Sequence, residues 1–149
     1  MTHRISAGVL VELDDRILLV RYGQHDFWVA PGGGARGTES LRETARREAR
    51  EETGLDIEVR ELMYIEEFHS PDVRYCKFWF AGWLLGGTLS VGGPEARAEG
   101  IAEAAWISRT EFAGKRVFPS VLADRYWTDR MQKPRVPVHL AEVRAVEFW

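Results

Sequence analysis

The sequence of 149 residues predicts an α/β fold, in which a mixed β-sheet is covered by helices on its faces. Short runs of β-favouring residues occur in both halves of the chain, and an amphipathic helix with clear end signals lies between them. This order of strands, helix, strands and helix is typical of a sheet with helical layers. Since no repeat or long linker divides the chain, we expect a single domain over residues 1–149.

The first part of the chain predicts a β-hairpin followed by a glycine-rich loop. Residues 5–13 and 17–22 are β-favouring runs, and the turn-like "DDR" separates them. The next segment, "FWVAPGGGARGTES", has three consecutive glycines directly after Pro31. We expect a loop here that allows the backbone to approach another group closely.

A helix is predicted from Glu39 to Thr53. Thr38 is the expected N-cap, because its hydroxyl oxygen can accept a hydrogen bond from the first turn. Gly54 followed by Leu55 is expected to end the helix in a left-handed conformation with an apolar contact.

The second half predicts further strands and a second helix. Ser108 and Glu111 have the spacing of a capping box, which predicts a helical turn. The segment 86–100 is rich in glycine and polar residues and is expected to be a loop. The predicted strands are residues 57–68, 75–85 and 104–107 and the β-like end "VPVHLAEVRAVEFW", and the predicted second helix is residues 120–131.

Composition excludes several classes of function. The net charge is -3 and the arginines are interleaved with acids, so we expect no binding to nucleic acid. The four histidines lack the spacing of a zinc site, and Cys76, the one cysteine, cannot form an intramolecular disulfide. No apolar run is long enough for a signal peptide core or a membrane span, so we expect a cytoplasmic protein that does not bind membranes.

The predicted helix carries an unusual group of acids. At 100° per residue, Ala45 and Ala49 lie on its core-facing stripe, and Glu48 and Glu52 fall on or beside that stripe. Glu51 lies on the flank of the stripe. Glu48 and Glu52 are therefore expected to lie at the edge of the core, where water is scarce. An unpaired carboxylate there costs free energy of folding.

The arginines of the helix offer only partial compensation. Arg46 and Arg50 are expected to point to the opposite, solvated side. Arg47 lies at helical spacing from Glu43 and Glu51, so it is expected to orient one acid without pairing with all of them. An exposed helix with solvated charges is the alternative interpretation, but it predicts acids away from the apolar stripe. A hard divalent cation such as Mg²⁺, which prefers carboxylate and phosphate oxygens, compensates the acids directly.

These residues resemble a known motif. From Gly33 to Leu55 the chain reads "GGARGTESLRETARREAREETGL", which resembles the Nudix box: Gly, five residues, Glu, seven residues, Arg-Glu, an aliphatic, one residue, Glu-Glu, one residue, Gly and an aliphatic. Ala49 stands where a bulkier aliphatic residue is usual. The fixed positions are filled by Gly33, Glu39, Arg47, Glu48, Glu51, Glu52 and Gly54.

The resemblance implies a Nudix-type α/β/α sandwich that hydrolyses a nucleoside diphosphate linked to another moiety. It implies that Glu48, Glu51 and Glu52, with the backbone carbonyl of Gly32, hold one or more Mg²⁺ ions, or Mn²⁺ instead. Arg47 and Glu39 would orient this cluster. The implied partner is a small-molecule nucleotide, and a homodimer is an option.

The resemblance leaves the catalytic base open. Glu52 is one candidate and Glu99, in the loop before Trp106, is another. Glu95 and Glu103 are further candidates in the same region. The set of expected catalytic residues is Glu51, Glu52, Glu99 and Arg47.

Substrate specificity is less clearly encoded. Pro71 lies 16 residues after Leu55, a placement that resembles ADP-ribose pyrophosphatases of the family. A proline in a loop is usually only a turn former, so the main argument is charge.

The glycine loop, the Pro71 region and segment 86–100 are expected to form the walls of the cleft, and they carry few positive charges. We therefore favour ADP-ribose or a nucleotide sugar, whose two phosphates a metal would bind. The alternatives are a nucleoside triphosphate pyrophosphohydrolase that removes damaged nucleotides and a Nudix-fold sensor without catalysis. Aromatic residues that could stack on a base are Trp28, Tyr75, Trp79 and Trp83, although aromatics in strands are more often part of the core.

Overall fold

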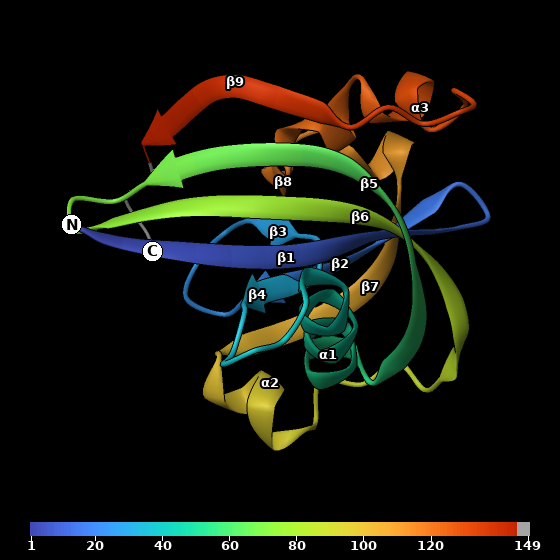
Figure 1. The fold of residues 1–149 in the computed structure, drawn as a ribbon. Coiled ribbons are helices and arrows are strands. Elements are labelled where there is room, and N and C mark those ends of the chain that lie inside the picture. The colour runs from blue at the N-terminus through green and yellow to red at the C-terminus, as the bar shows by residue number, and fades with distance from the viewer. Residues whose placement is uncertain (146–149) are drawn as a thin grey trace.

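A curled, mixed β-sheet dominates the computed structural model, which describes residues 1–145 (Figure 1). Within these residues, nine strands run in the order β8-β3-β2-β1-β6-β5-β9, with β4 paired to β1 and β7 paired to β2. The strands are β1 (Thr2–Leu13), β2 (Arg16–Tyr22), β3 (Trp28–Val29), β4 (Gly32–Gly34), β5 (Leu55–His69), β6 (Val73–Gly87), β7 (Ile101–Ser108), β8 (Val117–Phe118) and β9 (Val138–Ala145). The helices are α1 (Leu41–Thr53), α2 (Pro94–Ala98) and α3 (Tyr126–Asp129), and two 3-10 turns are η1 (Arg109–Phe112) and η2 (Ser120–Ala123).

The pairing of β1 explains why the sheet is mixed. It runs parallel to β6 over ten residue pairs, but it meets β2 in an antiparallel hairpin. Asp14 and Asp15 form the turn of this hairpin with φ values of 51° and 59°. Two residues with positive φ match the twist that a tight hairpin needs, so the predicted turn is confirmed.

Helical segments cover both faces of the sheet (Figure 1). On one face, Ala45 and Ala49 of α1 are fully buried against Val9 and Phe80 of the central strands. On the other face, the segments η1, η2 and α3 pack on a second core that includes Trp79. The predicted α/β class with helical layers on a mixed sheet is confirmed.

Helix α1 begins two residues later than predicted, and its N-cap is Ser40 instead of Thr38. The Oγ of Ser40 accepts from the backbone N–H of Glu43 at 3.2 Å, and the carboxylate of Glu43 accepts from the N–H of Ser40 at 2.7 Å. This reciprocal capping box satisfies two backbone donors at once, which a lone Thr38 could not do. The pattern Ser40-x-x-Glu43 was the missed signal.

The predicted end of α1 is confirmed. Gly54 adopts the left-handed conformation with φ 77°, and its N–H donates to the carbonyl of Arg50 at 2.9 Å. A Cβ at this position would lie 2.5 Å from the carbonyl oxygen of Thr88. Gly54 therefore ends the helix and also lets the loop after β6 approach closely.

Three predicted segments differ from the structure. The segment "FWVAPGGGARGTES" is not wholly a loop, because it contains the short strands β3 and β4. The segment 86–100 is not wholly a loop, because it contains the short helix α2, with Pro94 at its start. The predicted helix over 120–131 is divided into η2 and α3. Asp124, with φ -140° and ψ -92°, breaks it, and its side chain accepts from the N–H of Arg125. Such local side-chain hydrogen bonds compete with the helical pattern.

The remaining predicted strands are confirmed with longer bounds. The runs at 57–68 and 75–85 are the central parts of β5 and β6, and 104–107 lies within β7. The β-like end corresponds to β9, while its last four residues, 146–149, lie outside the described part of the chain.

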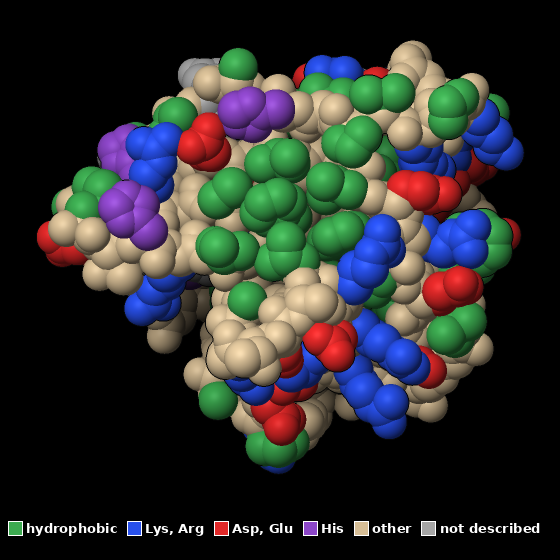
Figure 2. Space-filling view, viewed as in Figure 1, with side chains coloured by type: hydrophobic (Ala, Val, Ile, Leu, Met, Phe, Trp, Pro, Cys, Tyr) green, Lys and Arg blue, Asp and Glu red, His purple; other side chains and the backbone are tan. Residues whose placement is uncertain are grey.

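Helix α1 covers only part of its sheet face. Figure 2 shows apolar side chains gathered over the middle of β1, β6 and β5, beside the helix. Ile5 is 57% exposed, and Phe78 and Leu62 are only partly buried against the α1 core. Among the described residues, no helix has the length and apolar character that crossing a membrane requires.

The cap assignment gives a direct prediction. Ser40→Ala removes one half of the capping box and is expected to lower the free energy of unfolding by about 1 kcal/mol. Thr38→Ala is the matched control and should leave it within about 0.5 kcal/mol of the wild type. Urea unfolding followed by circular dichroism measures both variants. A larger loss of unfolding free energy in Thr38→Ala than in Ser40→Ala would show that Thr38 is the N-cap, as the sequence predicts.

Candidate active site

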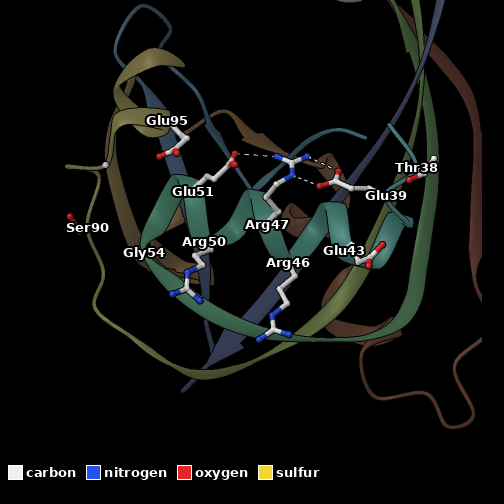
Figure 3. A pocket seen from close by; sticks show the side chains of 11 residues that line it. Thr38, Glu39, Glu43, Arg46, Arg47, Arg50, Glu51, Gly54, Ser90 and Glu95 are labelled. Carbon is white, nitrogen blue, oxygen red and sulfur yellow. Dashed lines mark hydrogen bonds and ion pairs between the residues drawn. The ribbon is translucent and has the colours of Figure 1, made fainter. Parts of the chain in front are cut away.

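The centre of the site is a pair of buried carboxylates on α1. Glu48 and Glu52 are 3% and 1% exposed, one helical turn apart on the side that packs against the sheet. The predicted position of these two acids at the edge of the apolar stripe is confirmed. Arg46 and Arg50 are exposed, point away from Glu51 in Figure 3, and have no hydrogen bond to the pair among those of the described residues.

The glycine loop lies directly against these acids. The backbone N–H of Gly32 donates to Oε1 of Glu52 at 3.4 Å. A Cβ on Gly33 would lie 2.6 Å from the carboxylate carbon of Glu48. The group that the glycines were expected to approach closely is therefore the carboxylate pair of α1.

One oxygen of each buried carboxylate lacks a hydrogen-bond partner among the described residues. These atoms are Oε2 of Glu48 and Oε2 of Glu52. Burial, followed by the charges of Glu99 and Glu48, raises the pKa of Glu52 well above its usual value. Because carboxylate oxygens are the ligands that hard divalent cations prefer, these residues fit such a cation.

Arg47 connects three acids, which corrects the expectation that it could orient only one. Its guanidinium donates to Glu39 at 2.5 and 2.9 Å and to Glu51 at 3.1 Å, as Figure 3 shows for these two acids, and also to Glu48 at 2.8 Å. It does not pair with Glu43, whose carboxylate caps the helix instead. The hydrogen bonds from Arg47 are the main reason that the pKa of Glu39 is lowered to about 2.

Glu99 joins the cluster from another part of the chain. Carboxylate oxygens of Glu48, Glu51 and Glu99 all lie within 4.8 Å of one another. Glu99 directly follows α2, and the next carbonyl, that of Gly100, accepts from the N–H of Gly23 at 2.9 Å. Burial and the charges of Glu48 and Glu51 raise the pKa of Glu99.

The other acids considered from the sequence lie apart from this group. Glu103 on β7 pairs with Arg21 at 3.3 Å and is half exposed. Glu95 lines a second hollow of about 910 Å³, which Arg47 and Glu51 of the site also line, but it is not one of the three clustered acids (Figure 3). Glu52 lies deeper than the three clustered acids and faces Gly32.

A cleft of about 850 Å³ opens at the carboxylates. Its lining residues are His3, Arg4, Ile5, Tyr22, residues 32–37, Glu48 and Glu99. Pro71 is not among them, so the wall expected from the Pro71 region is formed by the start of β1 instead. Among the aromatic candidates, Trp79 is a core residue with 1% exposure, Tyr75 stacks on Phe68 and Trp83 is 57% exposed.

Tyr22 was missed by the sequence analysis. It lies at an irregularity in the pairing of β2 with β7 and lines the cleft beside the acids. Burial, with smaller effects of Glu52, Glu99 and Glu48, raises the pKa of its hydroxyl. Tyr22 therefore stays a neutral hydrogen-bond donor in the cleft at physiological pH. No local pattern marks it, because only the sheet brings it to the site.

Comparison with known proteins agrees with this geometry. Residues 2–131 match the family model described as the NUDIX domain. The chain belongs to the Nudix hydrolase family. The box of this Nudix protein is thus the segment that carries Glu39, Arg47 and the clustered acids.

Individual relatives cover parts of the chain. The chain is 32% identical over 109 residues to the human "8-oxo-dGDP phosphatase NUDT18", covering 71% of the chain and 32% of the relative. It is 30% identical over 100 residues to the "ADP-ribose pyrophosphatase" of Methanocaldococcus jannaschii, covering 64% and 59%. A solved NUDIX hydrolase from Nitrosomonas europaea shares the fold with a TM-score of 0.72 at 20% identity, covering 98% and 80%. The chain thus spans less than two thirds of these curated relatives.

The glycine contact predicts an asymmetry between two neighbouring positions. Gly33→Ala would push the carboxylate of Glu48 aside and is expected to weaken Mn²⁺ binding about 10- to 100-fold, as changes to groups that orient metal ligands do. Gly34→Ala is the matched control, since nothing lies within 4 Å of a Cβ there. Isothermal titration calorimetry measures both affinities, and equal affinities would show that the Gly33 contact does not position Glu48.

Proposed function

We propose that this Nudix protein is a hydrolase that depends on Mg²⁺ or Mn²⁺ and cleaves the diphosphate linkage of a nucleoside diphosphate joined to another group. The observation that carries this proposal is the pair of buried, unpartnered oxygens on Glu48 and Glu52. Burying two such carboxylates for structure alone is costly, whereas a cation site explains them.

The box residues would hold the cation. Glu48, Glu51 and Glu52 would provide carboxylate oxygens, and Gly32 its backbone carbonyl. When bound, the ion would neutralise diphosphate oxygens and make a water more acidic. Arg47 orients Glu48 and Glu51, and Glu39 fixes Arg47 by two hydrogen bonds.

Glu99 is the preferred general base in this proposal. Water attacks one phosphorus of the diphosphate, the bond from that phosphorus to the bridging oxygen breaks, and two monophosphates form. Glu99 takes a proton from the water, since its carboxylate lines the cleft and its raised pKa makes it a better proton acceptor. Glu52 is the alternative base, although it lies deeper beside Gly32.

ADP-ribose or a nucleotide sugar is the favoured substrate. The described residues that line the cleft include two arginines, Arg4 and Arg36, and no lysine. Two phosphates need fewer protein cations than three, and the similarity to the ADP-ribose pyrophosphatase supports the same choice. The similarity to the 8-oxo-dGDP phosphatase favours the alternative, removal of damaged nucleotides.

Substrate class is tested with a panel of nucleotides at saturating Mg²⁺. We expect a higher kcat/KM for ADP-ribose or a nucleoside diphosphate sugar than for any nucleoside triphosphate. Hydrolysis in ¹⁸O-labelled water should give two monophosphates with the label on one of them. Faster release of pyrophosphate from a triphosphate would support the damaged-nucleotide alternative and contradict the favoured substrate.

The role of Glu99 as general base is tested by replacing Glu99 and, as a control, Glu103 with glutamine. Glu99→Gln should lower kcat about 100-fold or more, in the range typical of general-base removal, and should weaken Mn²⁺ binding less than Glu48→Gln does, although Glu99 lies beside the proposed ligands. Glu103→Gln is the matched control and should leave kcat unchanged, because Glu103 pairs with Arg21 away from the cluster. An unchanged kcat for Glu99→Gln would assign the role to Glu52.

A further inference from the structure

Arg36 in the glycine loop contacts the site through its side chain. Its guanidinium donates to both oxygens of Glu51, at 3.1 and 3.4 Å. Its backbone N–H donates to the carboxylate of Glu39 at 3.0 Å, which fixes the start of the side chain. Arg36 thus lines the cleft while its guanidinium contacts Glu51, one of the clustered acids.

Glu51 accepts hydrogen bonds from two arginines. One oxygen accepts from Arg36, and the other accepts from both Arg36 and Arg47. These three hydrogen bonds leave about one of the four lone-pair sites of the carboxylate open, and a cation bound there would lie beside the positive guanidinium of Arg36, which opposes its binding. Which arginine a cation would displace from Glu51 depends on how firmly Arg36 and Arg47 are each held.

Arg47 is the less mobile of the two. It is held by Glu39, Glu48 and the backbone carbonyl of Gly34, and its side chain is 19% exposed. The side chain of Arg36 is 59% exposed, and its one described ion pair is with Glu51. A cation that arrives at Glu51 would displace Arg36 and leave Arg47 in place.

A displaced Arg36 would remain beside the substrate. Its backbone is fixed at Glu39, and its guanidinium lies near Glu99, where its charge partly offsets the rise in pKa that burial causes. A guanidinium binds phosphate with two parallel hydrogen bonds, as it now binds Glu51. The cleft offers few other cations for this purpose.

We propose that Arg36 exchanges partners: it pairs with Glu51 until a divalent cation takes that carboxylate, and it then binds a phosphate of the substrate. This inference rests on the proposed cation-dependent function. The exchange would make cation binding and substrate binding mutually favourable. The cation would free the guanidinium of Arg36 for the phosphate, and the phosphate would free the carboxylate of Glu51 for the cation. Arg36 is thus a positioning residue for the substrate phosphate.

The test compares Arg36→Gln with Arg46→Gln, a matched control on the outer side of α1 that pairs with Asp56. Without nucleotide, Arg36→Gln should bind Mn²⁺ about 3- to 5-fold more tightly, because an ion pair that competes with the metal is removed. Its KM for the nucleotide should rise about 10-fold or more, with kcat changed less than KM, because a charge-assisted hydrogen bond to phosphate is lost. Arg46→Gln should change neither quantity.

Calorimetry with Mn²⁺ and steady-state kinetics measure these effects. Mn²⁺ affinity no higher in Arg36→Gln than in Arg46→Gln, or an unchanged KM, would overturn the inference. Arg36→Lys should give a KM between those of the wild type and Arg36→Gln, because lysine keeps the positive charge but lacks the two parallel N–H donors of the guanidinium. If Glu48→Gln and Glu51→Gln bind Mn²⁺ as the wild type does, the proposed function itself fails. If those variants lose Mn²⁺ binding while Arg36→Gln has no effect, only the inference on Arg36 fails.

Discussion

The burial of Glu48 and Glu52 is the physical constraint on which the rest of the site depends. A carboxylate in a water-poor environment is costly unless its oxygens have partners, and one oxygen of each acid has none among the described residues. The cost of this arrangement raises the pKa of Glu52. The charge of the buried Lys77 offsets part of this cost, and the cation that we propose for the site would offset more of it.

The surrounding architecture follows from that constraint. Glycine at position 33 is needed because a side chain there would occupy the space of the Glu48 carboxylate. Arg47 holds Glu48 and Glu51 on one side, and Glu39 holds Arg47. The pairing of β4 with β1 fixes the glycine loop to the sheet on which α1 packs. Loop, helix and sheet thus meet at the acids.

Local patterns predicted much of this structure. The 100° spacing placed Glu48 and Glu52 beside the buried Ala45 and Ala49, and Gly54 marked the helix end, because both are properties of a single helix. The sequence offered Glu99 only as one of several candidate bases and did not mark Tyr22. Both residues reach the acids of α1 through strand pairing and α2, which no local pattern encodes. The helix over 120–131 was wrong because Asp124 breaks it while both halves bury apolar residues in the same core.

The central claim, that the buried acids exist to bind a cation, is tested most directly by the free energy of unfolding measured against Mn²⁺ concentration. We expect wild-type stability to rise with added Mn²⁺, by about 2.7 kcal/mol at a hundred times the Kd. Glu52→Gln should be at least as stable as the wild type in EDTA, because the buried charge is gone, and should gain much less from Mn²⁺. A wild type that Mn²⁺ does not stabilise, together with a Glu52→Gln variant that is less stable in EDTA, would contradict the claim.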